Sequence, residues 1–425
     1  TKTNSNGWFY KLQGTLKRMG DFETPDYVMT NTGFAEHNFS FKAGLNRIDH
    51  GFDIYYSLFS NKLGILRSSH AHTAIDIINA IENEIPNVIE DFSYDINIPR
   101  QKISHSLLKL KAFKNFDFGK LIMRYDFQVN DRKEFDIRRG DRTKPALDLN
   151  LQTHSLAFDL ESKFQNNSNL KVGISGRYQK NFPDPYTGVK RIIPDYKKYD
   201  FSIYSIYDIS FDRNWLLEGG IRYDFSHINA YKYYRTSLWE ARNYDELFPE
   251  IVVEDLGLNT LTNPKFNFNN FSSNLGTRFT FNNAENIYFN YSISSRKPNP
   301  SELFSEGLHH SSARIEIGDL SFNSEVGHNI SLTYNFANEK SNLTVNSFAN
   351  YVNDFIYIIP VDIMPTIAGV FPYWEYKQQD AKLFGFDIKY DRQYFNNFFV
   401  GHQFSLIKGY ERENNKPLIN MPPVN

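Results

Sequence analysis

His309 and His310 stand next to each other in a stretch, residues 296–325, where the regular patterning of the chain stops. Imidazole nitrogens are common metal ligands, so this pair is a candidate for holding a metal complex. Adjacent histidines in an exposed loop are more often simply solvated, and that role is the alternative. Pro298 and Pro300 lack the amide hydrogen that a strand needs, which ends the strand before them. We expect a polar loop here that faces water, a ligand or the interior of the protein.

Three further charged residues belong to the same stretch. Arg296 lies at its start, and Glu302 and Glu316 follow it. Their charges are expected to pair with one another or with polar groups of a plug domain. That structural role is favoured over direct contact with a ligand.

A second pair of histidines, His70 and His72, is a weak candidate for a metal site. The residues after it favour a different interpretation, because Thr73 is a good N-cap and apolar residues then recur at helical spacing. These residues are Ala74, Ile75, Ile77, Ile78 and Ile81. The sequence therefore predicts a short amphipathic helix at this position.

Aromatic and cationic side chains gather in the polar stretch 229–264. Tyr233, Trp239 and Arg242 have the charge and ring surfaces that suit an anionic, aromatic ligand such as a catecholate siderophore. They would equally suit loops that pack on each other. The candidate ligand-binding residues are therefore His309, His310, Tyr233, Trp239 and Arg242.

The sequence carries no recognisable signature of catalysis. It has no Cys, which excludes thiolate nucleophiles and Cys-ligated metal sites. It also has no Gly-x-Ser-x-Gly, His-Glu-x-x-His, phosphate-loop or deaminase motif. A net charge of −2 over 425 residues gives no electrostatic footprint for nucleic acid. We expect neither an enzyme nor a nucleic-acid-binding protein, and no cofactor.

The elements that carry these residues show a period of two. About fifteen segments alternate apolar and polar residues over roughly 10 to 14 positions, against the usual 5 to 6 of a globular strand. That length suits a tilted bilayer crossing, which takes about 9 to 11 residues within the hydrocarbon. In one segment, the face predicted to contact lipid consists of Trp215, Leu217, Ile221, Tyr223 and Phe225. No window approaches the roughly 18 uninterrupted apolar residues of a transmembrane helix.

Short and long connections alternate along the chain. Short turns are predicted near 47–51, 113–117, 165–169, 212–214, 282–285, 338–341 and 394–397. Long loops are predicted near 19–33, 61–100, 129–150, 180–197, 229–264, 296–325 and 358–376. Alternate connections of an antiparallel meander lie at opposite ends, so one rim is expected to be short and periplasmic and the other long and extracellular. A soluble sandwich could share the period of two, but it would not readily explain long strands and sided loops together.

The polar faces of the segments bear on the size of the barrel. They carry many charged and amide side chains, so the lumen is expected to be wide and watered, or plugged by polar protein. An odd number of strands does not close an ordinary bacterial single-chain barrel. The sequence is therefore expected to be an internal piece of a longer chain, without an export signal at its start.

The stretch 294–334 resembles a segment of TonB-dependent outer-membrane receptors of the Bacteroidetes type. That segment reads as a strand, Arg-x-Pro-x-x-x-Glu-Leu, Gly-x-His, Glu-x-Gly and a second strand. The matching positions are Arg296, Pro298, Glu302, Leu303, Gly307, His309, Glu316 and Gly318, while Asp319 stands where the family usually has Asn. Further similar stretches, 31–44, 55–81, 91–110 and 419–424, extend the resemblance over nearly the whole chain.

The resemblance implies an all-β, antiparallel transmembrane β-barrel in the outer membrane of a Gram-negative bacterium. Residues 1–425 would form about 15 of its 22 strands, and the N-terminal plug and TonB box would be missing from this chain. The implied function is active uptake of a scarce nutrient, most notably an iron–siderophore complex, which would be cargo and not a cofactor. The implied partners are the TonB complex, outer-membrane lipid and the nutrient, around a monomeric barrel.

Three other kinds of outer-membrane barrel remain as alternatives. A passive porin would have about 16 to 18 strands and no plug. An outer-membrane barrel enzyme would need a nucleophile and base that the sequence does not show, and an adhesin would need only exposed loops. A plug domain and a TonB box upstream of residue 1 would favour transport over all of these.

Overall fold

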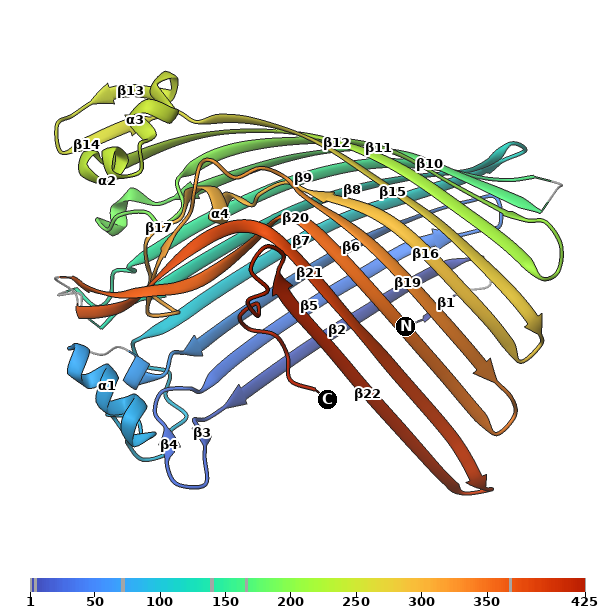
Figure 1. The fold of residues 1–425 in the computed structure, drawn as a ribbon, viewed down its shortest axis with the longest axis horizontal. Helices are drawn as coiled ribbons and strands as arrows, with labels where there is room; N and C mark the ends of the chain where they lie inside the picture. The colour runs from blue at the N-terminus through green and yellow to red at the C-terminus, as the bar shows by residue number, and fades with distance from the viewer. Residues whose placement is uncertain are drawn as a thin grey trace.

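A single curved antiparallel sheet dominates the protein in a computed structural model (Figure 1), which describes residues 2–3, 6–69, 73–137, 141–164, 167–366 and 369–424. Within these residues, fifteen long strands each pair with their neighbours in the chain order, as the sequence predicted. They are β2 (Trp8–Met19), β5 (Phe34–Asn46), β6 (His50–Gly64), β7 (Arg100–Phe116), β8 (Gly119–Phe135), β9 (Leu147–Lys163), β10 (Ser168–Pro183), β11 (Asp195–Ser210), β12 (Trp215–Arg235), β15 (Lys265–Asn282), β16 (Glu285–Arg296), β19 (Glu325–Ala337), β20 (Ser341–Thr366), β21 (Gly369–Phe395) and β22 (Phe398–Glu411).

The sheet is open in the described part of the chain. No ladder joins β2 to β22 there, and β22 pairs only with β21. This agrees with the prediction of a partial barrel. None of the helices in these residues has the length and apolar character that a membrane crossing requires.

The connections fall into two classes at opposite ends of the sheet, as predicted (Figure 1). Each of the seven predicted short turns falls between two consecutive paired strands, for example between β11 and β12 and between β15 and β16, and residues 165 and 166 of one of these turns lie outside the described residues. The long connections hold the remaining elements. These are β3 (Phe22–Glu23), β4 (Val28–Met29), η1 (Arg67–Ser69), α1 (Ala74–Asn83), η2 (Pro185–Thr187), α2 (Thr236–Ala241), α3 (Tyr244–Leu247), η3 (Pro249–Ile251), β13 (Val252–Asp255), β14 (Asn259–Thr262), α4 (Pro300–Phe304), β17 (Glu306–His309) and β18 (Arg314–Ile317), with the two-residue β1 (Lys2–Thr3) preceding β2.

The predicted helix after residue 73 is confirmed. Helix α1 begins at Ala74, its N-cap is Thr73, and Asp76 completes a capping box by accepting the Thr73 amide hydrogen bond. This satisfies two of the donors that a helix start leaves unpaired.

One loop prediction is wrong and four are too long. Residues 358–376 form a two-stranded ribbon in which β20 and β21 stay paired as far as Thr366 and Gly369. The sequence there is rich in β-branched and aromatic residues, and the register shift beside Pro360 accommodates a residue without an amide hydrogen. The strands also run further into four other predicted loops, which shrink to 65–99, 136–146, 184–194 and 236–264.

The faces of the sheet match the predicted assignment. Trp215 and Ile221 on β12 are 45% and 57% exposed, whereas Arg222 on the other face hydrogen-bonds Asp224 at 2.7 and 2.6 Å. The connection from β16 to β19 contacts strands as distant in the sheet as β8 and β21, so it lies inside the curve. Since Lys297 of this connection reaches Asp200 on the charged face at 2.6 Å, the charged face is the inner one.

The main apolar core lies at the rim of long loops and not in the lumen. It joins the ends of β11 and β12 to α2, α3, α4 and the segment after β18. Its fully buried centre includes Tyr234, Trp239, Tyr244, Leu303 and Phe304. This core holds loops that are distant in sequence against one part of the wall.

Two isoleucines of β11 provide a test of which face of the sheet meets lipid and which meets the lumen. Ile203 lies opposite Tyr223 on the outer face, and Ile206 lies opposite Lys171 on the inner face. We predict that Ile203→Arg lowers the free energy of unfolding by roughly 2–4 kcal/mol, because Arg would meet hydrocarbon. Ile206→Arg, the matched control, should cost less than about 1 kcal/mol since it meets lumen water. Denaturant unfolding in lipid vesicles measures both, and a larger loss for Ile206→Arg would reverse the assignment.

Candidate functional site

The mouth of the sheet is crossed by residues 297–324, which we call the mouth loop. It starts with α4, where Asn299 and Glu302 form a capping box, and it continues as the β17–β18 hairpin. Strand β18 then pairs in parallel with β21, with Ile315 opposite Tyr373. The loop therefore leaves β16, crosses the interior and meets the wall at separate places.

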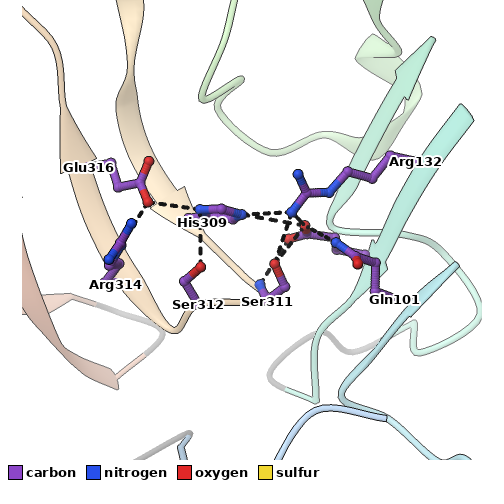
Figure 2. Close-up of polar contacts among 8 residues, drawn as sticks. Gln101, Arg132, His309, Ser311, Ser312, Arg314 and Glu316 are labelled. Carbon is purple, nitrogen blue, oxygen red and sulfur yellow. Dashed lines mark hydrogen bonds and ion pairs between the residues drawn. The ribbon is translucent and has the colours of Figure 1, made fainter. Parts of the chain in front are cut away.

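A buried carboxylate on β8 receives the tip of the mouth loop (Figure 2). Glu134 is 0% exposed, and it accepts hydrogen bonds from the amide and the hydroxyl of Ser311, both at 2.9 Å. Gln101 on β7 donates to the same carboxylate at 3.0 Å, and Arg132 forms an ion pair with it. The carboxylate is thus shared between the wall and the loop.

His309 links this carboxylate cluster to the second strand of the hairpin (Figure 2). Arg132 lies 2.7 Å from its Nε2, and Glu316 lies 2.9 Å from its Nδ1. Because a guanidinium can only donate, Nε2 accepts, and the neutral ring carries its hydrogen on Nδ1 and donates it to Glu316. Burial alone raises the pKa of Glu316, but the hydrogen bond from His309 and the charge of Arg314 hold that pKa below its usual value.

His310 attaches to the wall separately. Its Nδ1 lies 2.7 Å from a carboxylate oxygen of Asp136, just beyond β8, and the side chain is buried. Its Nε2 is buried and has no hydrogen-bond partner among the described residues. The two adjacent histidines therefore point to different acidic partners, and both lie within the contact between loop and wall.

The near end of the mouth loop is attached through Glu306. This buried carboxylate pairs with Lys190 from the β10–β11 connection and with Lys232 on β12, the latter at 3.2 Å. Burial raises the pKa of Glu306, but the charges of Lys232 and Lys190 bring it below its usual value. Lys232 also donates to the carbonyl oxygen of Phe304 at 2.5 Å.

The predicted polar residues Arg296 and Glu302 lie together at the start of the mouth loop. Arg296 contacts Glu302 at 2.9 Å and Glu325 at the start of β19 at 2.5 Å. Glu316 lies apart from them, with His309 and Arg314. These contacts lie within the loop and its flanking strands.

The remaining candidate residues are not gathered in one place. Tyr233 is 54% exposed and lines a cavity of about 280 Å³ with Lys190 and Arg191. Trp239 is 2% exposed inside the apolar core, so a ligand would reach it only if the loops moved. Arg242 lines a different cavity of about 280 Å³ and donates to the carbonyl oxygen of Gly318 at 3.2 Å.

That second cavity lies between the α2–α3 connection, the segment after β18 and β21. Its lining combines two cations, Arg242 and Lys377, with the rings of Tyr244 and Tyr376. Two acids, Asp319 and Glu375, also line it. Such a lining can hold an anionic ring by charge, stacking and hydrogen bonding.

Two outcomes concern metal binding. His70 and His72 lie outside the described residues, so their prediction stands as it was made. Among the residues that the structure does describe, no group of three or more His, Asp or Glu side chains has the arrangement of a metal site.

The wall residues Arg132, Glu134 and Asp136 were missed in the sequence. The alternation of β8 indicates that Arg132 and Glu134 face inward with Arg124, but it gives no partner for them. Their contacts with Ser311 and His310 join positions 177 and 174 residues apart, and no local pattern encodes such pairs.

Comparison with known proteins identifies the family of this fold. The family described as "TonB dependent receptor-like, beta-barrel" matches residues 15–425. The chain belongs to the TonB-dependent receptors. Barrels of this family lie in the outer membrane of Gram-negative bacteria, and that is where this receptor lies. No curated protein matches the sequence.

Solved structures share the fold at low sequence identity. The copper transporter OprC is 12% identical with a TM-score of 0.70, over 98% of this chain and 59% of that one. The FrpB iron transporter of Neisseria meningitidis (F5-1 variant) is 14% identical with a TM-score of 0.66, over 98% and 61%. The siderophore receptor PirA of Pseudomonas aeruginosa is 11% identical with a TM-score of 0.64, over 96% and 61%. The chain thus spans about three fifths of the length of these structures.

The shared carboxylate of the receptor can be tested by removing its charge. We predict that Glu134→Gln makes the tip of the mouth loop open more easily by roughly 3 kcal/mol, because a buried ion pair and two bonds to Ser311 are weakened. Hydrogen exchange of amides 306–317 should then be roughly a hundredfold faster.

The matched control for this variant is Asp148→Asn. Asp148 pairs with Lys133 on the outer face of the same rim, at 2.7 Å, and does not bond the mouth loop. Its exchange profile over 306–317 should equal that of the unmodified receptor. Equal profiles for all three proteins would show that Glu134 does not hold the loop.

Proposed function

We propose that this receptor takes up a scarce nutrient across the outer membrane, and that the nutrient is an iron–siderophore complex with anionic, aromatic iron-binding groups. The observation that carries the proposal is the cavity at the loop rim where Arg242 and Lys377 lie beside Tyr244 and Tyr376. A catecholate complex presents negative charge and flat rings, which this combination of side chains suits. The iron complex is cargo in this proposal.

Family membership supports the transport part of the proposal. Among similar structures, one is named a copper transporter, one an iron transporter and one a siderophore receptor. We infer that a plug domain and a TonB box elsewhere in the full-length protein connect a monomeric barrel to the TonB complex. Energy input is then required because a ligand held tightly enough to be captured when scarce is released slowly.

A passive porin is the alternative, and the mouth loop argues against it. The loop crosses the interior and is attached at Glu134, at Glu306 and along β21, so it obstructs the path that a diffusing solute would take. An enzyme is disfavoured because family members act as receptors and transporters.

Uptake by intact cells tests the transport proposal. Cells that carry the full-length receptor should accumulate a radiolabelled ferric catecholate, whereas cells without the gene should not. Dissipating the proton-motive force should abolish accumulation, because release into the periplasm is driven through TonB. Accumulation that survives the uncoupler would indicate a porin, and accumulation of no iron chelate in a panel would exclude iron as the cargo.

Binding by the purified full-length receptor tests the cavity. We predict that Arg242→Gln weakens binding of the ferric catecholate about tenfold or more, since a charge-assisted contact is worth roughly 1.5–3 kcal/mol. Arg235→Gln is the matched control, because Arg235 ends β12 at the same rim and does not line the cavity. Equal affinity in both variants would place the ligand elsewhere.

A further inference from the structure

The outer face of β9 to β15 carries an ordered set of side chains that the transport function does not use. Direct cross-strand partners form rows across the strands, and residues two positions apart along a strand share a face. Near the loop rim, one row contains Lys180 on β10 opposite Lys197 on β11, with Lys265 on β15 in register two strands further on. The amides that complete the row are those of Gln152 on β9 and Asn229 on β12.

The row immediately below is aromatic. Tyr178 and Tyr199 are direct partners with ring centroids 5.1 Å apart, and imidazoles flank them on both sides. His154 follows Tyr178 at 6.3 Å, and His227 follows Tyr199 at 6.4 Å. This continuous belt of rings with polar atoms is typical of the boundary between hydrocarbon and headgroups.

The next rows are apolar. Below Tyr199 on β11 come Phe201 and Ile203, and below Tyr178 on β10 come Gly176 and then Ile174; the side chains of Phe201, Ile203 and Ile174 are exposed. They belong to the face that meets lipid. The order from the middle of the sheet toward the loop rim is therefore hydrocarbon side chains, then rings, then ammonium groups.

The three lysines lack acidic partners. In the described chain, none of their ammonium groups takes part in an ion pair or a hydrogen bond, although those of other lysines of the rim do. The acid closest along β11 on this face, Asp195, is already paired with Arg191. Like charges directly opposite each other in a sheet destabilise it, so the pairing of Lys180 with Lys197 calls for an external anion.

We propose that this surface binds the phosphate group of a membrane lipid. Lys180 and Lys197 extend from facing positions about 5 Å apart, and Lys265 lies about 10 Å further along the row, within reach of one headgroup. Long lysine side chains at this level direct their ammonium groups to the lipid phosphates, while the tyrosines and apolar rows contact the acyl chains. The apolar rows favour a lipid over free phosphate, since a free ion gains nothing from them. The site is independent of the cargo proposed above.

Titration of the full-length receptor in detergent tests the proposal. The probe is short-chain phosphatidic acid, with phosphatidylcholine of the same chains and inorganic phosphate as comparisons. We expect phosphatidic acid to bind more tightly than either, and the double variant Lys180→Gln, Lys197→Gln to weaken its binding about tenfold or more. Lys133→Gln, a lysine of the same face and rim that is paired with Asp148, should change it less than about twofold.

Three results would overturn the lipid site. They are unchanged phosphatidic acid binding in the double variant, equal binding of phosphatidylcholine, and equal binding of inorganic phosphate, which would indicate a free-anion site.

A second measurement uses the unmodified receptor, so its result does not depend on whether the variants fold. Phosphatidic acid should slow acylation of Lys180, Lys197 and Lys265 by an amine-reactive ester several-fold and leave Lys133 unchanged. Equal rates with and without the lipid contradict the proposal.

Discussion

Hydrocarbon offers no hydrogen bonds to a peptide group, and the rest of this structure depends on that constraint. Every strand from β5 to β21 in the meander has a partner on each edge, so its amides and carbonyls are satisfied within the sheet. Satisfying the backbone this way fixes the side-chain period at two, because successive residues of a strand point to opposite faces. The inner face can then be charged while the outer face remains apolar. Contacts with a polar cargo are thereby confined to the interior and the two rims.

The charged side chains of the interior also determine where the mouth loop lies. A carboxylate inside the curve is stable when it is paired, as Asp224 is with Arg222 and Asp200 is with Lys297. Glu134 lies at the rim end of β8, where the wall alone provides only Arg132 and Gln101. The mouth loop supplies the remaining donors through Ser311. The position of the loop is therefore set by buried polar groups of the barrel wall, because these groups need hydrogen-bond donors that the wall itself does not provide.

The sequence predicted what is encoded locally. Strand alternation, hairpin turns and the N-cap at Thr73 each depend on residues within a few positions, and all three are confirmed. The ribbon at 358–376 was mistaken for a loop, because the bulge beside Pro360 that lets the two strands stay paired is not visible in a linear pattern. The sequence also indicated that the loop around His309 was special. It could not give the partners Arg132 and Glu134, because only the curvature of the sheet around the loop brings them within reach.

The mouth loop is held by different forces at its two ends. Near α4, Leu303 and Phe304 are buried in the apolar core with Trp239, and withdrawing a side chain such as Phe304 into water would cost roughly 1.5–3 kcal/mol without compensation. At the tip, Ser311 and His309 are held by hydrogen bonds and ion pairs, and water or an anionic ligand can replace such contacts, which reduces the net loss. The resistance to movement is therefore concentrated at the α4 end. A ligand that competes for Arg132 or His309 would displace the tip while the α4 end stays docked, so exchange between closed and open mouths would be a pivot about the apolar core.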